Sequence, residues 1–171
     1  MFLDIHELQR QKIVFEESFL PGRIDFGEEM RQVEILSAQG LAELVSSDIR
    51  LRGFLRTVVE VPCARCLEPA RCPVEMEFDL FYSPIATIAR AVEAEIKTAD
   101  LEVGFYQGDG LWLEDAVREQ VLLSLPMKSI CRSDCAGLCP QCGQNRNFAQ
   151  CGCHPPLEDS QWTPLAKFRI E

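Results

Sequence analysis

Cysteine spacing constrains this 171-residue chain more than any other feature. Six of its nine cysteines lie within 23 residues, from Cys131 to Cys153, and two more form a Cys63-x2-Cys66 pair. The segment around the six is interrupted by Gly, Pro and Asn and has little apolar material for a core of its own. Where thiols stay reduced, structural disulfides are rare, and cysteines at such spacing are interpreted first as metal ligands.

The N-terminal residues indicate a cytoplasmic protein, which is the reducing setting that this interpretation needs. Asp4 and Glu7 stand where a signal peptide would carry bases. No run approaches the 18 apolar residues that a membrane span requires. We therefore expect no membrane association and assign the cysteines to metal binding.

Zinc is the ion that these cysteines fit best, because it favours four thiolate or imidazole ligands in a tetrahedron. Pro140 stiffens the turn of the Cys139-Pro-Gln-Cys142 pair, and Gly143 tolerates the backbone geometry that follows it. Eight cysteines in four pairs suffice for two zinc ions, and Cys72 is left over as a small buried hydrophobe on a strand. The four pairs are Cys63 with Cys66, Cys131 with Cys135, Cys139 with Cys142, and Cys151 with Cys153.

Spacing alone leaves three ways to combine the pairs into two sites. The preferred combination ties the first pair to the second, as site 1, and leaves the last two pairs as a local site 2. Its rival joins the two middle pairs and gives Cys151 and Cys153 to the first pair, and His154 could replace a cysteine. Iron–sulfur binding also satisfies the ligand type. Site 1 would contain Cys63, Cys66, Cys131 and Cys135, and site 2 Cys139, Cys142, Cys151 and Cys153.

Alternating hydrophobicity predicts a long strand from Ile49 to Val61. Its aliphatic residues share one parity and its charged residues the other. A second strand is expected over Val74 to Tyr82, so the first cysteine pair would lie at the tip of a hairpin. The aliphatic face comprises Leu51, Leu55, Val59 and Val61, and the opposite face Arg50, Arg52, Arg56 and Glu60.

A helix is predicted over residues 111–125, because apolar residues recur at every fourth position from Leu113 to Leu125. Asp109 is its expected cap and Pro126 its end. Shorter strands are expected at 13–19 and 41–45, and 85–97 is interpreted as a helix or a mobile loop. The predicted fold class is α+β: a mainly antiparallel β-sheet with one or more packed helices. Residues 1–130 would form this domain, with 131–171 as a zinc-bound, cysteine-rich tail packed on it.

The net charge of −10 argues against simple electrostatic wrapping around nucleic acid. The acidity is concentrated in residues 67–125, which carry 12 acidic and 4 basic side chains. This segment could attract a basic protein or simply keep the chain soluble. Five arginines nevertheless fall in the 22 residues around the first cysteine pair, and they form a candidate RNA-contacting face or an ordinary solvated strand face. They are Arg50, Arg52, Arg56, Arg65 and Arg71.

The cysteine blocks resemble the family of large ribosomal RNA subunit accumulation proteins, YceD. The matching stretches are Val61-Pro-Cys-Ala-Arg-Cys-Leu-Glu68, Leu122-Leu-Ser-Leu-Pro126 and the cysteine pattern from Cys131 to Cys153, including Asn147. Some members of the family keep the first pair while lacking the last four cysteines. The resemblance therefore favours the preferred combination, in which those four form one complete site.

The resemblance implies a ribosome biogenesis factor that supports 23S rRNA accumulation or processing and large-subunit assembly. Its partners would be rRNA or a pre-ribosomal particle, and a basic ribosomal protein is a further candidate. We expect no enzyme and no small-molecule substrate, because all-cysteine zinc sites are closed and neither His6 nor His154 lies in a catalytic motif. The alternatives are a zinc or thiol redox sensor and an adaptor or chaperone for a basic ribosomal protein.

Overall fold

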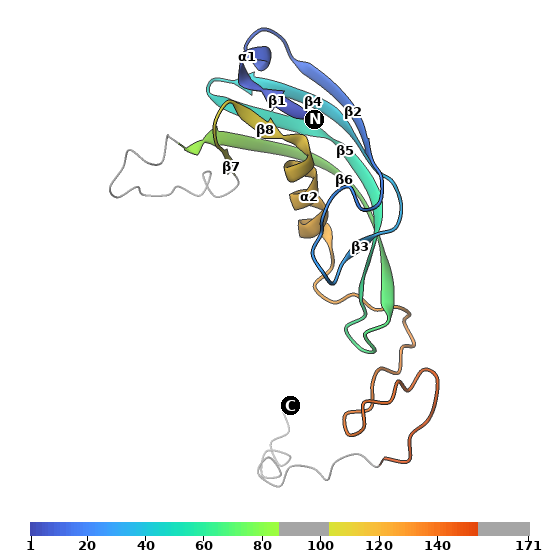
Figure 1. Ribbon diagram of the computed structural model, residues 1–171. Coiled ribbons are helices and arrows are strands. Elements are labelled where there is room, and N and C mark those ends of the chain that lie inside the picture. The colour runs from blue at the N-terminus through green and yellow to red at the C-terminus, as the bar shows by residue number, and fades with distance from the viewer. Residues whose placement is uncertain (86–102, 154–171) are drawn as a thin grey trace, which may run out of the picture.

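A computed structural model describes residues 1–85 and 103–153 of the chain (Figure 1). The fold is built on a curved sheet of six strands, with one helix lying against it. None of the helices in this part of the chain is long and apolar enough to cross a membrane. The elements are β1 (Phe2–Asp4), α1 (Ile5–Leu8), β2 (Ile13–Phe19), β3 (Arg31–Gln32), β4 (Leu36–Val45), β5 (Asp48–Pro62), β6 (Pro69–Pro84), β7 (Val103–Tyr106), β8 (Gly110–Trp112) and α2 (Leu113–Ser124).

The large sheet has the order β2-β4-β5-β6-β7, and β3 pairs with β5 beside this path. All its pairings are antiparallel except that of β6 with β7, which is parallel. β1 and β8 form a separate two-stranded antiparallel sheet. The predicted α+β class with a mainly antiparallel sheet is therefore confirmed.

The hairpin of β5 and β6 is the longest feature of the sheet and carries the first cysteine pair at its tip. Its strands remain in register from Ile49 opposite Tyr82 to Pro62 opposite Pro69. Leu51, Leu55 and Val59 are completely buried, whereas the arginines of the opposite parity are half-buried or exposed. The predicted alternation is thus confirmed, and it fixes which face of the sheet packs on the core.

α2 covers the apolar face of the sheet with the residues that its periodicity predicts (Figure 1). Leu113, Val117 and Val121 are buried, and Leu125 packs against the core just beyond the helix. The predicted cap at Asp109 is wrong, because the helix begins after Trp112, which makes no side-chain cap bond. Residues 110–112 are instead drawn into β8 by pairing with β1, and the Asp109 carbonyl accepts a hydrogen bond from Ile5 N.

The predicted strand over 13–19 has these bounds, and the strands expected at 41–45 and 74–82 are longer than their apolar patterns. Most of the helix or loop expected over 85–97 lies outside the described residues, as does His154. Beyond α2 the chain turns to the hairpin tip and continues as the cysteine-rich segment (Figure 1). Within 126–153 the only pairing of strand type is an isolated bridge between Leu138 and Asn145.

Candidate metal centres

The hairpin tip folds into a tight knuckle around Cys63 and Cys66. Cys63 N donates to the Glu68 carbonyl at 2.8 Å, and Leu67 N donates to the Cys63 carbonyl at 3.0 Å. Leu67 adopts a φ of 63°, in the left-handed region that residues other than glycine seldom occupy. This turn leaves the amide of Arg65 3.5 Å from Cys63 Sγ, directed at the sulfur.

A second knuckle, at Cys139 and Cys142, repeats this backbone pattern. Cys139 N donates to the Gln144 carbonyl at 2.8 Å, and Gly143 N donates to the Cys139 carbonyl at 2.9 Å. Gly143 has a φ of 72°, so it takes the conformation of Leu67 without a Cβ to strain it. The bridge between Leu138 and Asn145 occupies the place of the last hairpin pair, Pro62 with Pro69. The two cysteine pairs therefore stand on equivalent turns.

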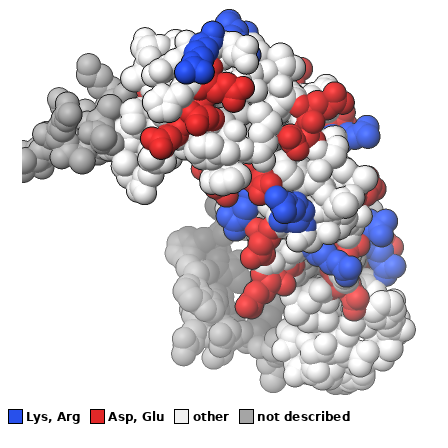
Figure 2. Space-filling model, turned by 45° about the horizontal axis from the view of Figure 1, so that its top comes forward, with Lys and Arg blue, Asp and Glu red and all other residues white. Residues whose placement is uncertain are grey.

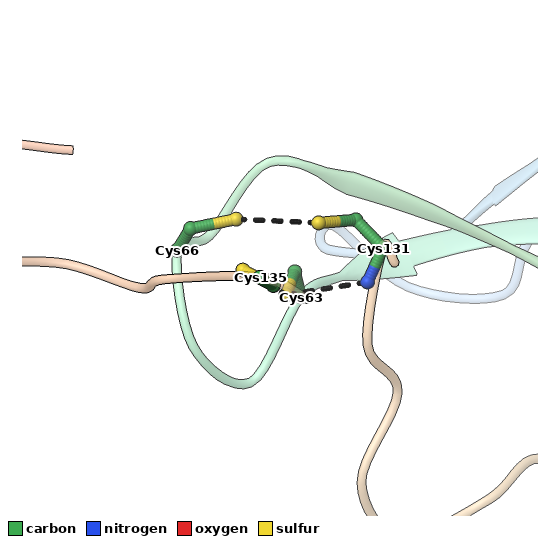
Figure 3. Close-up of side chains that lie close together, drawn as sticks. All are labelled: Cys63, Cys66, Cys131 and Cys135. Carbon is green, nitrogen blue, oxygen red and sulfur yellow. Dashed lines mark hydrogen bonds between the residues drawn. The ribbon is translucent and has the colours of Figure 1, made fainter. Parts of the chain in front are cut away.

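The first knuckle meets the segment after α2, so that four cysteines converge (Figure 3). The Sγ atoms of Cys66 and Cys131 lie 3.6 Å apart, and those of Cys63 and Cys135 lie 3.9 Å apart. A tetrahedral zinc ion with Zn–S bonds of about 2.3 Å holds its sulfurs about 3.8 Å apart. Three of the four residues are buried, and Cys131 is exposed. This set has the spacing of one mononuclear tetrahedral centre.

The second knuckle meets the Cys151-x-Cys153 pair in a more exposed group. The four sulfurs of Cys139, Cys142, Cys151 and Cys153 lie within 4.8 Å of one another. Cys139 is buried, Cys151 is half-buried and the other two are exposed. Both groups could hold a metal ion, and they are the two sets of the combination preferred from the sequence.

Backbone amides lower the pKa of one thiol in each knuckle. The amide of Cys131, 3.4 Å from Cys63 Sγ, is the largest cause of a Cys63 pKa of about 6. The amide of Cys142 is the largest cause of a similar value, about 6, for Cys139. Loss of hydration around the Cys131 sulfur raises its pKa to about 12, and a hydrogen bond with Cys142 contributes most to raising the pKa of Cys153 to about 12. Each group therefore combines a thiolate at neutral pH with thiols that lose their protons when a metal binds.

Asn147 contacts a cysteine of site 1, although sequence reasoning left it without a role. Its Nδ2 atom donates to Cys135 Sγ at 3.4 Å, and this bond is the largest cause of a lowered Cys135 pKa. Its place within the matching cysteine pattern was the available signal, but nothing in local spacing shows that it contacts the other site. Cys72 lies outside both groups, is buried, and has its Sγ 3.4 Å from Ser129 Oγ.

The five arginines around the hairpin are largely engaged by neighbouring groups. Arg50 Nη2 lies 2.6 Å from Asp79 Oδ2, and its guanidinium lies 5.2 Å from the centroid of the Phe81 ring. Arg52 pairs with Glu43 at 3.7 Å, and Arg71 pairs with Glu60 at 3.1 Å.

Arg65 donates to the Cys135 carbonyl at 3.0 Å, which assigns it to site 1. Arg56 is exposed and makes no ion pair among the described residues. In Figure 2 basic and acidic side chains alternate over the visible face and do not form a separate basic patch.

The chain matches the family model of the large ribosomal RNA subunit accumulation protein YceD over residues 51–169. An uncharacterized protein of Mycobacterium tuberculosis is 35% identical over 102 residues, which are 59% of this chain and 46% of that protein. The Arabidopsis thaliana large ribosomal RNA subunit accumulation protein YCED homolog 1, chloroplastic, is 26% identical over 151 residues, covering 71% of this chain and 44% of the homologue. Its Zea mays counterpart is 28% identical over 138 residues, covering 63% and 44%. This chain thus spans less than half the length of these relatives, and no solved structure matches it.

Proposed function

Since the chain belongs to the YceD family of large ribosomal RNA subunit accumulation proteins, we propose that it is a non-enzymatic factor for large-subunit assembly. The family name implies a role in accumulation of large-subunit rRNA. The match over residues 51–169 is the observation that carries this proposal, because it includes the hairpin and both cysteine groups. Its compartment is the cytoplasm, where reduced thiols remain available for metal.

Both cysteine groups are proposed to hold zinc in a structural role. The sulfur separations in site 1 support a single tetrahedral ion, since a multi-iron cluster between the thiolates would hold them further apart. Four thiolates complete the coordination of zinc and leave no open position for a water or a substrate. Zinc at both sites would fix the tail at the hairpin tip, and this rigid end of the molecule would present its surface to a partner.

The partner is proposed to be rRNA or a pre-ribosomal particle. Ion pairing of Arg50, Arg52 and Arg71 weakens their attraction for phosphate, so any direct contact relies most on Arg56, opposite Glu75 in the neighbouring strand. We expect Arg52→Gln/Arg56→Gln to weaken binding of 23S rRNA fragments in a gel-shift assay, and Arg10→Gln/Arg23→Gln to serve as the charge-matched control. Equal affinities of the two variants would refute RNA contact by this face and would favour a basic ribosomal protein as the partner.

The function is tested by deleting the gene in its host and measuring the ratio of 23S to 16S rRNA. We expect the ratio to fall, wild-type protein to restore it, and Cys63→Ser/Cys66→Ser to fail because site 1 loses its knuckle ligands. Cys72→Ser is the matched control, since this cysteine belongs to neither group. An unchanged ratio after deletion would overturn the proposal, and full rescue by the double variant would separate the function from site 1.

A redox sensor is the second candidate, and the exposure of Cys142 and Cys153 in site 2 favours it. Exposed thiolates react readily with oxidants, and their oxidation would release the metal. Reversible zinc loss at low peroxide concentrations, accompanied by a change in 23S rRNA accumulation, would support this role. Zinc retention under the same treatment would exclude the redox-sensor role.

A further inference from the structure

One side chain joins the two metal sites. Asn147 lies in the eight-residue stretch between Cys142 and Cys151, the stretch that site 2 closes into a loop. Its Nδ2 atom, however, donates to Cys135 Sγ at 3.4 Å, and Cys135 belongs to site 1. A residue of the site 2 loop thus supplies a hydrogen bond to a ligand of site 1, and such bonds orient metal ligands and stabilise their charge.

The orientation of the Asn147 carboxamide is fixed by its other partners. Oδ1 accepts from Ala136 N at 2.8 Å and from Arg132 Nη2 at 2.9 Å. Nδ2 gives its second hydrogen to Asn145 Oδ1 at 2.8 Å. All the donor and acceptor positions of the amide are used, and two donors at Oδ1 leave only the nitrogen to face the sulfur.

A backbone contact gives a second, independent connection. The Arg65 carbonyl accepts from Leu138 N at 3.0 Å, and the Arg65 amide faces Cys63 Sγ. Leu138 directly precedes the first cysteine of site 2. Gly137 permits this approach, because a Cβ on it would lie 3.0 Å from the Arg65 carbonyl oxygen. The two knuckles are therefore in direct contact through their turns.

We propose that the two sites bind metal with positive cooperativity and that Asn147 is the positioning residue that couples them. The inference rests on the proposed zinc occupancy. With site 2 empty, Cys142 and Cys151 no longer close residues 143–150 into a loop. The conformational entropy lost when Asn147 is ordered then opposes metal binding at site 1. With site 2 filled, Asn147 is already placed beside Cys135. By linkage, site 1 raises the affinity of site 2 by the same factor.

The first test uses the unmodified full chain and native mass spectrometry during zinc titration. At half-saturation, independent sites give a one-zinc species of at least about half of the chains, and coupling lowers this fraction. A one-zinc fraction well below half supports the proposal. Two bound zinc ions with a fraction at or above half would overturn a coupling strong enough to fill the two sites together, whereas a chain that binds no zinc would overturn the proposed metal occupancy as well.

The second test assigns the coupling to Asn147 with a double-mutant cycle. Asn147→Asp keeps the acceptors but places a carboxylate oxygen against Cys135, and we expect zinc affinity at site 1 to fall about 10- to 100-fold. In the Cys151→Ser/Cys153→Ser background, which lacks site 2, Asn147→Asp should lower the zinc affinity of site 1 less than about threefold. Gln144→Glu is the matched control, because it makes the same amide-to-acid change at an exposed position of the same loop. An equal loss in both backgrounds, or no loss in either, would overturn the assignment.

Cobalt spectroscopy provides a signal that would not change if Asn147 had a purely structural role. Hydrogen bonds to a thiolate lower the energy of its lone-pair electrons, so their removal shifts thiolate-to-cobalt charge transfer to longer wavelength. We expect this shift for Co²⁺ at site 1 in Asn147→Asp and not in Gln144→Glu. Identical spectra for wild type and Asn147→Asp at full occupancy would refute the contact on which the coupling depends.

Discussion

Metal removal should unfold the cysteine-rich segment and leave the sheet intact. Within residues 131–153, seven backbone N–H groups donate hydrogen bonds to backbone carbonyl oxygens. At about 1 kcal/mol each, these bonds contribute about 7 kcal/mol. Ordering the 23 residues costs about 1 kcal/mol per residue at the lower end, or about 23 kcal/mol. The segment alone therefore falls about 16 kcal/mol short of stability.

Two structural zinc ions supply the missing free energy in this account. Each contributes about 10 kcal/mol at the lower end of the range for thiolate sites, which exceeds the deficit by about 4 kcal/mol. The sheet should not depend on metal in this way, since Leu51, Leu55 and Val59 are completely buried in its core. Chelation should thus unfold residues 131–153 while the sheet stays folded.

Hydrogen exchange measured by mass spectrometry, with and without a strong chelator, provides the assay. With metal bound, we expect slow exchange in 131–153; after chelation, exchange there should reach the rate of an unstructured peptide. Amides of β5 between Ile49 and Val59 should keep their protection. Continued protection of residues 131–153 in metal-free protein would refute the conclusion that this segment needs metal to be stable. Simultaneous loss in β5 would show that the sheet also depends on metal.

Four substitutions test other parts of the fold. Leu67→Gly should raise the free energy of unfolding by up to about 1 kcal/mol, since it relieves the left-handed strain against a smaller entropic loss. Gly143→Ala should lower it by about 1 kcal/mol, because alanine is strained at this positive φ. Chemical denaturation of zinc-loaded protein measures both, and a fall for Leu67→Gly or a rise for Gly143→Ala would contradict the equivalence of the knuckles. Cys72→Ala should retain two zinc ions by native mass spectrometry, and loss of one would place this thiol in a site. Leu55→Ala should lower the free energy of unfolding by about 2–5 kcal/mol through a core cavity, and a change below about 1 kcal/mol would contradict its burial.

The hairpin and the helix face were predictable because their signals are local. Alternation along β5 and the four-residue period of α2 record directly which side chains meet the core. The start of α2 was not predictable in this way. Asp109 is a suitable cap by composition, but pairing of β8 with β1 brings residues from opposite ends of the chain together and sets the boundary at Trp112. β1 has only three residues, too few for a periodic pattern.

The metal groups show the same division between local and distant information. The cysteine pairs are visible in the spacing, which indicated the eight candidate ligands. Which pairs combine depends on the hairpin reaching the segment after α2, and spacing left that open. The contact of Asn147 with Cys135 depends on how the two groups pack together, and no short pattern contains it. The arginines on one face of β5 were visible in the sequence, but ion pairs of Arg50 with Asp79 and of Arg52 with Glu43, on the adjacent strands, weaken their attraction for RNA phosphates.

The two knuckles share a turn but differ in what holds them. The first closes a hairpin that remains in register along its length, so the sheet positions Cys63 and Cys66 before any metal binds. The second rests on one isolated bridge, so the placement of Cys139 and Cys142 should depend on the proposed metal and on contacts with the first knuckle. Preorganised ligands bind metal with less loss of entropy, and site 1 should therefore be the first of the two to bind within each chain. Once it does, the contacts through Arg65 and Asn147 favour closure of site 2, so the tail should order as one unit and not in two separate steps.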